Sequence, residues 1–286
     1  MDRRTTDGLL LVDKPAGMTS HDVVATVRRA FDEPRVGHAG TLDPFATGLL
    51  VLLLGRGTRL IPYLDAEPKR YEATVRFGAE TATDDCSGAV VREAAIPDPA
   101  AVDAALASLT GSVEQVPPAY SAKQVGGVRA YAAARRGAPL DLKPVGVRVH
   151  EWQVLGWRGA DLDVRVSCAG GTYVRALARD LGRAAGSAAH LVALRRTQSG
   201  QFDVRDAVAL GALDAAGGAV RPLLDAVPHL PVQALDAPEA ELASHGRSVP
   251  ARVEGERVAL LEEDALLAVG VRDGDRWQPR VVLRGG

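Results

Sequence analysis

A single carboxylate in a glycine-punctuated stretch is the first candidate for chemistry. The stretch reads Gly37-His38-Ala39-Gly40-Thr41-Leu42-Asp43-Pro44-Phe45-Ala46-Thr47-Gly48. Pro44 biases the backbone of Asp43 away from the right-handed helical region, and glycines allow close backbone approaches that a Cβ forbids. We therefore expect Asp43 on a shaped loop, where catalytic groups tend to lie. The alternative is an aspartate that only hydrogen-bonds its own turn.

Basic residues gather in two stretches, although the formal net charge of the chain is −2. Residues 121–149 carry six basic residues and one acid, and residues 172–200 carry five and one. Such stretches suit a surface that contacts nucleic-acid phosphates, or else a solvated helix face. Residues 229–286 carry seven arginines and ten acids, so this end of the chain lacks the same bias.

The sequence gives little support for a disulfide, a metal site, a signal peptide or a membrane span. Cys86 and Cys168 form no CxxC pair, and we expect reduced thiols that pack inside a cytoplasmic protein. The six histidines never fall at metal-ligand spacing, so we expect no zinc. The apolar run at residues 9–12 is too short for a signal-peptide core or a membrane span.

Helical and strand patterns alternate without a regular βαβ period, which predicts an α+β fold around a mainly antiparallel sheet. Strands are expected at 8–14, 49–54, 70–77, 145–154, 162–167 and 190–197, and helices after Ser20 and at 58–64, 97–109 and 173–185. Thr172 is expected to cap the last helix. Beyond a boundary near residues 225–231, short strands separated by turns predict a small β-barrel of roughly sixty residues.

Further sequence blocks, in a fixed order, make the chain resemble a known family. They are Asp13-Lys14-Pro15-Ala16-Gly17-Met18-Thr19-Ser20, Lys69-Arg70-Tyr71-Glu72-Ala73, Pro117-Pro118-Ala119-Tyr120-Ser121-Ala122-Lys123, Arg129-Ala130-Tyr131, Gly170-Gly171-Thr172-Tyr173-Val174-Arg175 and Leu194-Arg195-Arg196-Thr197. With the Asp43 loop, they resemble the bacterial tRNA pseudouridine-55 synthases of the TruB type over essentially the whole chain. The resemblance implies a pseudouridine-synthase fold, with a mainly antiparallel mixed central sheet flanked by helices, and a C-terminal barrel of the PUA type.

The resemblance also implies an isomerase that acts on tRNA. Such enzymes flip one uridine out of the T-loop, cut its glycosidic bond, rotate the uracil and join C5 to the ribose. Flipping costs roughly a few kcal/mol. No cofactor, metal, membrane or obligate protein partner is implied, and we expect a cytoplasmic monomer. The implied domains are a catalytic domain at 1–227, with an RNA-gripping insertion at about 121–149, and an RNA-binding domain at 228–286.

Three residues match the catalytic residues of the family. Asp43 matches the catalytic aspartate, since a carboxylate can attack carbon or stabilise positive charge at a glycosidic centre. Arg175 matches the arginine that pairs with this aspartate and holds its pKa down; the alternative is an arginine on a solvent-facing helix surface. Tyr71 matches the tyrosine that stacks on the target base and removes the C5 proton, or else is a core aromatic.

Further residues match positions that bind the substrate or brace the site. His38 matches the histidine that fills the space left by the flipped nucleotide, and Tyr173 matches a second pocket tyrosine. Leu194 matches an apolar residue against the target base, and Lys14 and Pro15 match residues that brace the loop, unless Lys14 is a surface lysine. Phosphate contacts from the insertion are expected for Lys123, Arg129, Arg135 and Arg136.

Other functions stay open at this point. The chain could be an RNA-binding protein that refolds the tRNA elbow and isomerises only secondarily, or a guide-RNA-dependent synthase inside a ribonucleoprotein. A hydrolytic glycosidase usually needs a second placed carboxylate, which the sequence does not indicate. The reaction route is also open, because Asp43 can attack C1′ of the ribose, attack C6 of the uracil, or act through a glycal-like intermediate.

Overall fold

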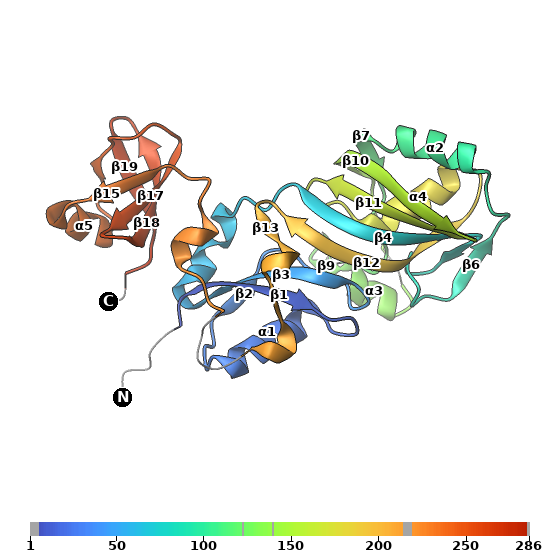
Figure 1. Ribbon diagram of the computed structural model, residues 1–286, viewed down its shortest axis with the longest axis horizontal. Coiled ribbons are helices and arrows are strands. Elements are labelled where there is room, and N and C mark those ends of the chain that lie inside the picture. Colours follow the sequence, from blue (N-terminus) through green and yellow to red (C-terminus); the bar gives the residue numbers. More distant parts are fainter. Residues whose placement is uncertain (1–5, 122, 139, 214–218, 285–286) are drawn as a thin grey trace. The chain divides into compact units, whose positions relative to one another are not determined.

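The computed structural model describes residues 6–121, 123–138, 140–213 and 219–284, and the chain forms two compact units. The first unit comprises Met1–Pro44, Leu49–Asp65 and Val204–Gly286, and the second comprises Phe45–Gly48 and Ala66–Asp203. Each unit contains strands in mostly antiparallel pairs with helices packed on them, which confirms the predicted α+β class (Figure 1).

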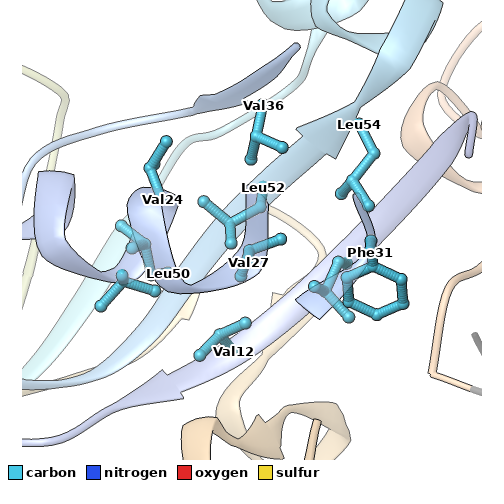
Figure 2. Packing of buried hydrophobic residues seen from close by; sticks show 10 residues of the cluster. Val12, Val24, Val27, Phe31, Val36, Leu50, Leu52 and Leu54 are labelled. Carbon is cyan, nitrogen blue, oxygen red and sulfur yellow. The ribbon is translucent and has the colours of Figure 1, made fainter. Parts of the chain in front are cut away.

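The core of the first unit surrounds strand β1 (Gly8–Lys14). This strand lies between β14 (Val208–Ala209) and β3 (Thr47–Leu54), and β2 (Val36–His38) pairs antiparallel with β3. Helix α1 (Ser20–Ala30) packs on these strands through apolar side chains at helical spacing. The buried cluster, drawn in Figure 2, consists of Leu10, Val12, Val23, Val24, Val27, Phe31, Val36, Leu50, Leu52 and Leu54. Full burial of such side chains stabilises the fold by about 1.5–3 kcal/mol each, so this cluster holds β1 and α1 firmly.

The start of α1 is set by a capping box. The backbone N–H of Asp22 donates to Thr19 Oγ1 at 3.1 Å, and the backbone N–H of Thr19 donates to the Asp22 carboxylate at 2.8 Å. The hydrogen bonds from Thr19 lower the pKa of Asp22 below its ordinary value. Because both donors are satisfied, the turn that connects β1 to α1 ends at a defined residue.

The second unit is built on an antiparallel run of five strands. Their order is β12 (Ala189–Ser199), β4 (Lys69–Phe77), β11 (Asp161–Cys168), β10 (Val145–Arg158) and β7 (Gly111–Gln115). Helix α4 (Val174–Ala184) packs on β12, and α2 (Pro99–Ser108) packs on α4 (Figure 1). The alternation expected for β4 is confirmed, because its buried residues are Tyr71, Ala73, Val75 and Phe77.

Shorter elements complete this part of the chain. The 3₁₀ segment Gly55–Tyr63 follows β3, and β13 (Phe202–Asp203) pairs with β12. The two-stranded sheet of β5 (Ala79–Thr81) and β6 (Val90–Glu93) follows β4. The expected insertion contains β8 (Gln124–Val125), β9 (Val128–Arg129) and α3 (Ala130–Arg135).

The C-terminal strands form a second sheet inside the first unit. The elements are β15 (Val232–Leu235), α5 (Ala237–Ser244), β16 (Val249–Pro250), β17 (Arg257–Glu262), β18 (Ala265–Asp273) and β19 (Arg276–Val282). The strand order is β15-β17-β18-β19-β16, an open path among the described strands where the sequence predicted a barrel. Its core contains the fully buried Trp277, whose Nε1 donates to Gln233 Oε1 at 3.0 Å.

One local expectation was wrong, and one helix was missed. Thr172 does not cap α4: Tyr173 is the N-cap residue, its backbone N–H donates to Gln115 Oε1 at 2.7 Å, and Gln115 Nε2 donates to the Tyr173 carbonyl at 3.1 Å. A side chain from β7 therefore satisfies the helix start in place of a local hydroxyl. Helix α5 was not expected, although Asp236 and Glu239 form a capping box at its start.

Candidate active site

The residues singled out from the sequence fall into two sets, one in each unit. The set in the first unit consists of Lys14, Pro15, His38 and Asp43. The set in the second unit consists of Tyr71, Tyr173, Arg175 and Leu194. Each set has its own supporting framework.

The loop that carries Asp43 connects β2 to β3 and is held by a buried lysine. Lys14 is 0% exposed at the end of β1, so it is not a surface lysine. Its Nζ donates to the carbonyl oxygens of Met18 at 2.7 Å, Pro15 at 2.9 Å and Pro44 at 3.4 Å. One ammonium therefore joins the turn after β1 to the residue that directly follows Asp43.

A second group of hydrogen bonds fixes the backbone on both sides of Asp43. The N–H of Leu42 donates to Ser20 Oγ at 2.9 Å, and this hydroxyl lies 3.2 Å from the Leu42 carbonyl. The N–H of Gly17 donates to the Pro44 carbonyl at 2.8 Å. Sequence reasoning assigned no role to Ser20 or Gly17 in the site. The loop is a rigid platform, as the preorganisation of a catalytic group requires.

The other end of the glycine-punctuated stretch is tied down by Gly48. Gly48 pairs with Arg196 of β12 in parallel register and has φ +99°. A Cβ at this position would lie 2.3 Å from the Arg196 carbonyl oxygen and 2.8 Å from its nitrogen. The motif therefore needs glycine here because two backbones touch.

His38 ends β2, opposite Leu52 of β3, and is half-buried. Its ring meets the ring of His21 edge-on, with centroids 5.7 Å apart and planes at 82°. His21 lies in the first turn of α1, so the helix that braces the Asp43 loop also orients this imidazole. Sequence reasoning gave His21 no role.

Tyr71 and Leu194 share one face of the antiparallel run. Tyr71 on β4 is 7% exposed and lies opposite Arg196 of β12 and Val166 of β11. Leu194 is also 7% exposed and lies opposite Ala73, the next residue of β4 on the same face. The two side chains thus lie one row apart on the sheet.

Arg175 is buried in the first turn of α4. The guanidinium is 4% exposed, which excludes a solvent-facing helix arginine. It donates from Nη1 to the Thr83 carbonyl at 2.9 Å and from Nη2 to the Tyr120 carbonyl at 2.8 Å, and Nη1 lies 3.6 Å from the Asp85 carboxylate. Several partners from distant segments hold the charge in one orientation.

Arg175 is the first of three arginines at four-residue spacing, which share one face of α4. Each meets an acid from β5 or the turn after it: the pairs are Arg175 with Asp85, Arg179 with Asp84, and Arg183 with Glu80. Hydrogen bonds from Arg183, and then from Arg92, hold the pKa of Glu80 at about 2. Burial raises the pKa of Asp84 in spite of Arg179. Sequence reasoning missed these acids because their partners lie about a hundred residues further along the chain.

The remaining candidates are Tyr173 at the start of α4 and the basic residues of the insertion. Tyr173 is half-buried, and its backbone is clamped by Gln115 as described above. Lys123 and Arg136 of the insertion are exposed. The side chains of Arg129 and Arg135 lie outside the described part of the structure.

Neither cysteine forms a disulfide, but only one of them packs in the interior. Cys168 is buried, and burial raises the pKa of its thiol to about 11. Cys86 is exposed, so the expectation that both thiols pack inside was wrong for Cys86. Within the ranges that the structure describes, no group of three or more His, Cys, Asp or Glu side chains could hold a metal ion. Nor does any helix in those ranges have the length and apolar character to cross a membrane.

Comparison with known proteins covers almost the whole chain. Residues 28–174 match the model of the TruB family pseudouridylate synthase N-terminal domain, and residues 175–226 match that of the tRNA pseudouridylate synthase B C-terminal domain. The tRNA pseudouridine synthase B of Thermobifida fusca (strain YX) is 48% identical, with 98% of this chain and 99% of the relative covered. The protein of the same name from Mycobacteroides abscessus is 45% identical, with 97% and 96% covered.

Solved structures agree on the fold. The match to a Cbf5-Nop10-Gar1 complex has a TM-score of 0.72 at 25% identity and covers 97% of this chain and 85% of that one. The match to an archaeal box H/ACA sRNP Nop10-Cbf5 complex has a TM-score of 0.70 at 25% identity and covers 97% and 86%. Family models, near-full-length relatives and fold lead to one conclusion: the chain belongs to the TruB family of pseudouridylate synthases.

Proposed function

We propose that the chain isomerises the uridine at position 55, in the T-loop of tRNA, to pseudouridine. The observation that carries the proposal is the identity of 43–48% to proteins named tRNA pseudouridine synthase B, which extends over 97–98% of the chain. The three residue types that the reaction needs, a carboxylate, an aromatic hydroxyl and a guanidinium, are present as Asp43, Tyr71 and Arg175.

The reaction begins when the target nucleotide leaves its stack, because no protein group can reach its glycosidic bond otherwise. Asp43 then acts as the nucleophile toward C1′ or C6, and the bond between N1 of uracil and C1′ of ribose breaks. The bond that the Asp43 carboxylate forms with the substrate breaks again before the product leaves, which regenerates the free carboxylate. The freed uracil rotates, a bond forms between C5 and C1′, and the C5 proton leaves while N1 gains one. The product is an isomer, so the proposed reaction has no net oxidation, reduction or transfer to a second molecule, and the scheme uses no cofactor.

Each protein group has one task in this scheme. Arg175 pairs with the Asp43 carboxylate and keeps it ionised, since a guanidinium is always charged. Tyr71 stacks on the uracil and accepts the C5 proton. Support for an orienting role of Arg175 comes from its partners Thr83, Tyr120 and Asp85, which leave the guanidinium little freedom.

The other candidates bind and position the substrate. His38 fills the gap left by the flipped nucleotide, Leu194 packs against the target base, and Tyr173 lines the same pocket. Lys14 and Pro15 hold the Asp43 loop through the hydrogen bonds of the Lys14 ammonium. Phosphate contacts come from the insertion residues Lys123, Arg129, Arg135 and Arg136.

We propose a division into a catalytic domain at 1–227, with the insertion at about 121–149, and a PUA-like RNA-binding domain at 228–286. The five-stranded C-terminal sheet with α5 supports a separate module at this end. The enzyme acts in the cytoplasm as a monomer without an obligate protein partner or metal. Two free cysteines fit a reducing compartment.

Chemical mapping on a full-length tRNA transcript tests the proposed site of modification. Carbodiimide treatment marks pseudouridine as a stop in primer extension. We expect one enzyme-dependent stop, at position 55, without any added guide RNA. A stop that appears only when a guide RNA is supplied would instead indicate a ribonucleoprotein enzyme, and a stop at another position would refute the proposed target.

A further inference from the structure

Lys69 belongs to the sequence block that contains Tyr71, but the scheme above gives it no task. It is the first residue of β4, and its side chain is half-buried. Its cross-strand neighbours are Cys168 on β11 and Ser199 on β12, both buried. Because side chains alternate along a strand, Lys69 and Tyr71 lie on the same face of the sheet, two residues and about 6.6 Å apart.

The charged neighbour with the largest electrostatic effect on the pKa of Lys69 is another cation, Arg196. Burial lowers the pKa of Lys69 most, and the neighbouring Arg196 lowers it further. Arg196 is 1% exposed and lies opposite Tyr71, in the row next to that of Lys69. Glu67 raises the pKa of Lys69 by less, and its carboxylate accepts the backbone N–H of Gly170 at 2.8 Å.

Two basic side chains, those of Lys69 and Arg196, therefore lie in the rows beside and opposite Tyr71, and that of Lys69 is half-buried. Within the described part of the chain, the Lys69 ammonium has no hydrogen bond to a protein acceptor and no ion pair within 4 Å. A half-buried ammonium beside a second cation lowers stability unless an anion joins it. The substrate class that this family modifies, RNA, carries one negative charge per nucleotide, so a phosphate of the bound RNA can supply this anion.

We propose that Lys69 binds a phosphodiester of the RNA substrate, on the nucleotide that contacts Tyr71 or its immediate neighbour. The inference rests on the proposed function, because it places the target nucleotide against Tyr71. Lys69 is thus a substrate-binding residue that holds the flipped nucleotide by its backbone. A backbone contact adds affinity and salt dependence without reading the base.

The test measures binding of a labelled T-arm stem-loop to the full-length chain over a series of salt concentrations. Lys69→Met is compared with Lys69→Arg and with Arg70→Met, a matched control on the next residue, exposed and on the opposite face. We expect Lys69→Met to weaken binding about tenfold, as for one lost hydrogen bond to a charged group. The slope of log affinity against log salt should fall by about 0.7–0.9, the effect of one phosphate contact. Lys69→Arg should retain the slope.

A slope for Lys69→Met that equals the wild-type slope, or a fall of the same size for Arg70→Met, would overturn the inference. A second measurement needs no variant that might fail to fold. Each phosphate near the target uridine is replaced in turn by a neutral methylphosphonate, and binding to the wild-type chain is measured. We expect the methylphosphonate at one position to weaken binding to the wild-type chain about tenfold. The same methylphosphonate should not weaken binding to the Lys69→Met variant any further. Equal small losses at every position would contradict a dedicated phosphate contact.

Tritium release from the unsubstituted stem-loop, labelled at C5 of the target uridine, separates this inference from the proposed function. Release by the wild type together with binding that does not depend on Lys69 overturns the phosphate contact alone. Binding that depends on Lys69 without any release overturns the proposed reaction alone. A stem-loop that does not bind at all overturns both.

Discussion

Gly48 and Arg196 are paired so closely that the first has no room for a side chain. The Cβ of an alanine at position 48 would lie 2.3 Å from the Arg196 carbonyl oxygen, and φ at this position is +99°. The last glycine of the Asp43 motif is therefore a packing requirement of the β3–β12 pairing. The strand that it contacts carries Leu194 and Arg196, which lie on the Tyr71 face of the second unit.

The close contact predicts the effect of Gly48→Ala. We expect a loss of at least about 1–3 kcal/mol in the free energy of unfolding, because the variant adds both backbone strain and a steric clash. Urea unfolding measures this loss. The control is Gly146→Ala, at a strand position where an added Cβ meets nothing within 4 Å. Equal midpoints for the two variants would contradict the close approach.

The buried Lys14 ammonium predicts a second stability effect. Lys14→Met removes a buried donor that serves the carbonyl oxygens of Met18, Pro15 and Pro44. We expect unfolding to become easier by about 2–3 kcal/mol, and turnover to fall because the residue next to Asp43 loses its anchor. Thermal unfolding and tritium release measure the two effects. The exposed Lys143→Met is the matched control, and a Lys14→Met protein that behaves like it would refute the bracing role.

The contact between Asp85 and Arg175 predicts that loss of the Asp85 charge lowers the turnover number without changing the affinity for RNA. Asp85→Asn keeps the shape but removes the charge that lies 3.6 Å from the Arg175 guanidinium. We expect kcat to fall about tenfold, the equivalent of about 1.4 kcal/mol, while the Kd for a T-arm stem-loop stays unchanged. Single-turnover kinetics and binding measurements give the two constants. Asp103→Asn, on the exposed side of α2, serves as the control. An unchanged kcat for Asp85→Asn would show that Arg175 needs no help from this acid.

The Glu80 pKa of about 2 predicts how stability depends on acid pH. Glu80 has an ordinary pKa of 4.5, so its folded-state pKa is depressed. The stability that it contributes is fully present above about pH 4.5 and is lost as the pH falls toward 2. Glu80→Gln should therefore have a shallower fall in unfolding free energy between pH 5 and 2 than the wild type. The pKa of Asp84 is raised, but its contribution to the pH dependence is present in both proteins and cancels in the difference between the two curves. Parallel curves would refute the role of Arg183 and Arg92 at this carboxylate.

Much of the fold could be predicted from local patterns. Strand β4 was predicted correctly from its alternating apolar residues, Tyr71, Ala73, Val75 and Phe77, because every second side chain of this strand is buried. Thr19 and Asp22 marked the start of α1 because a capping box is a local device. The same reasoning failed for α4, where Gln115, 58 residues earlier, satisfies the helix start in place of Thr172.

Most supporting groups of the candidate site could not be predicted from local patterns in the sequence. A bracing role for Lys14 was expected only from the family resemblance, because its burial follows only from the hydrogen bonds to Met18 and Pro44. Arg175 meets Thr83 and Tyr120, which are 92 and 55 residues away. Motifs identify the candidate site residues, whereas most of the groups that hold them are set by tertiary packing between distant segments.

The most direct test of the account is tritium release from a T-arm stem-loop labelled with tritium at C5 of the target uridine. Loss of the C5 hydrogen is the direct signal, because pseudouridine has the same mass as uridine. We expect release by the wild type, and none above background by Asp43→Asn, which should still bind the stem-loop. Equal release by both proteins, or none by a wild type that binds the stem-loop, would contradict a synthase that depends on Asp43.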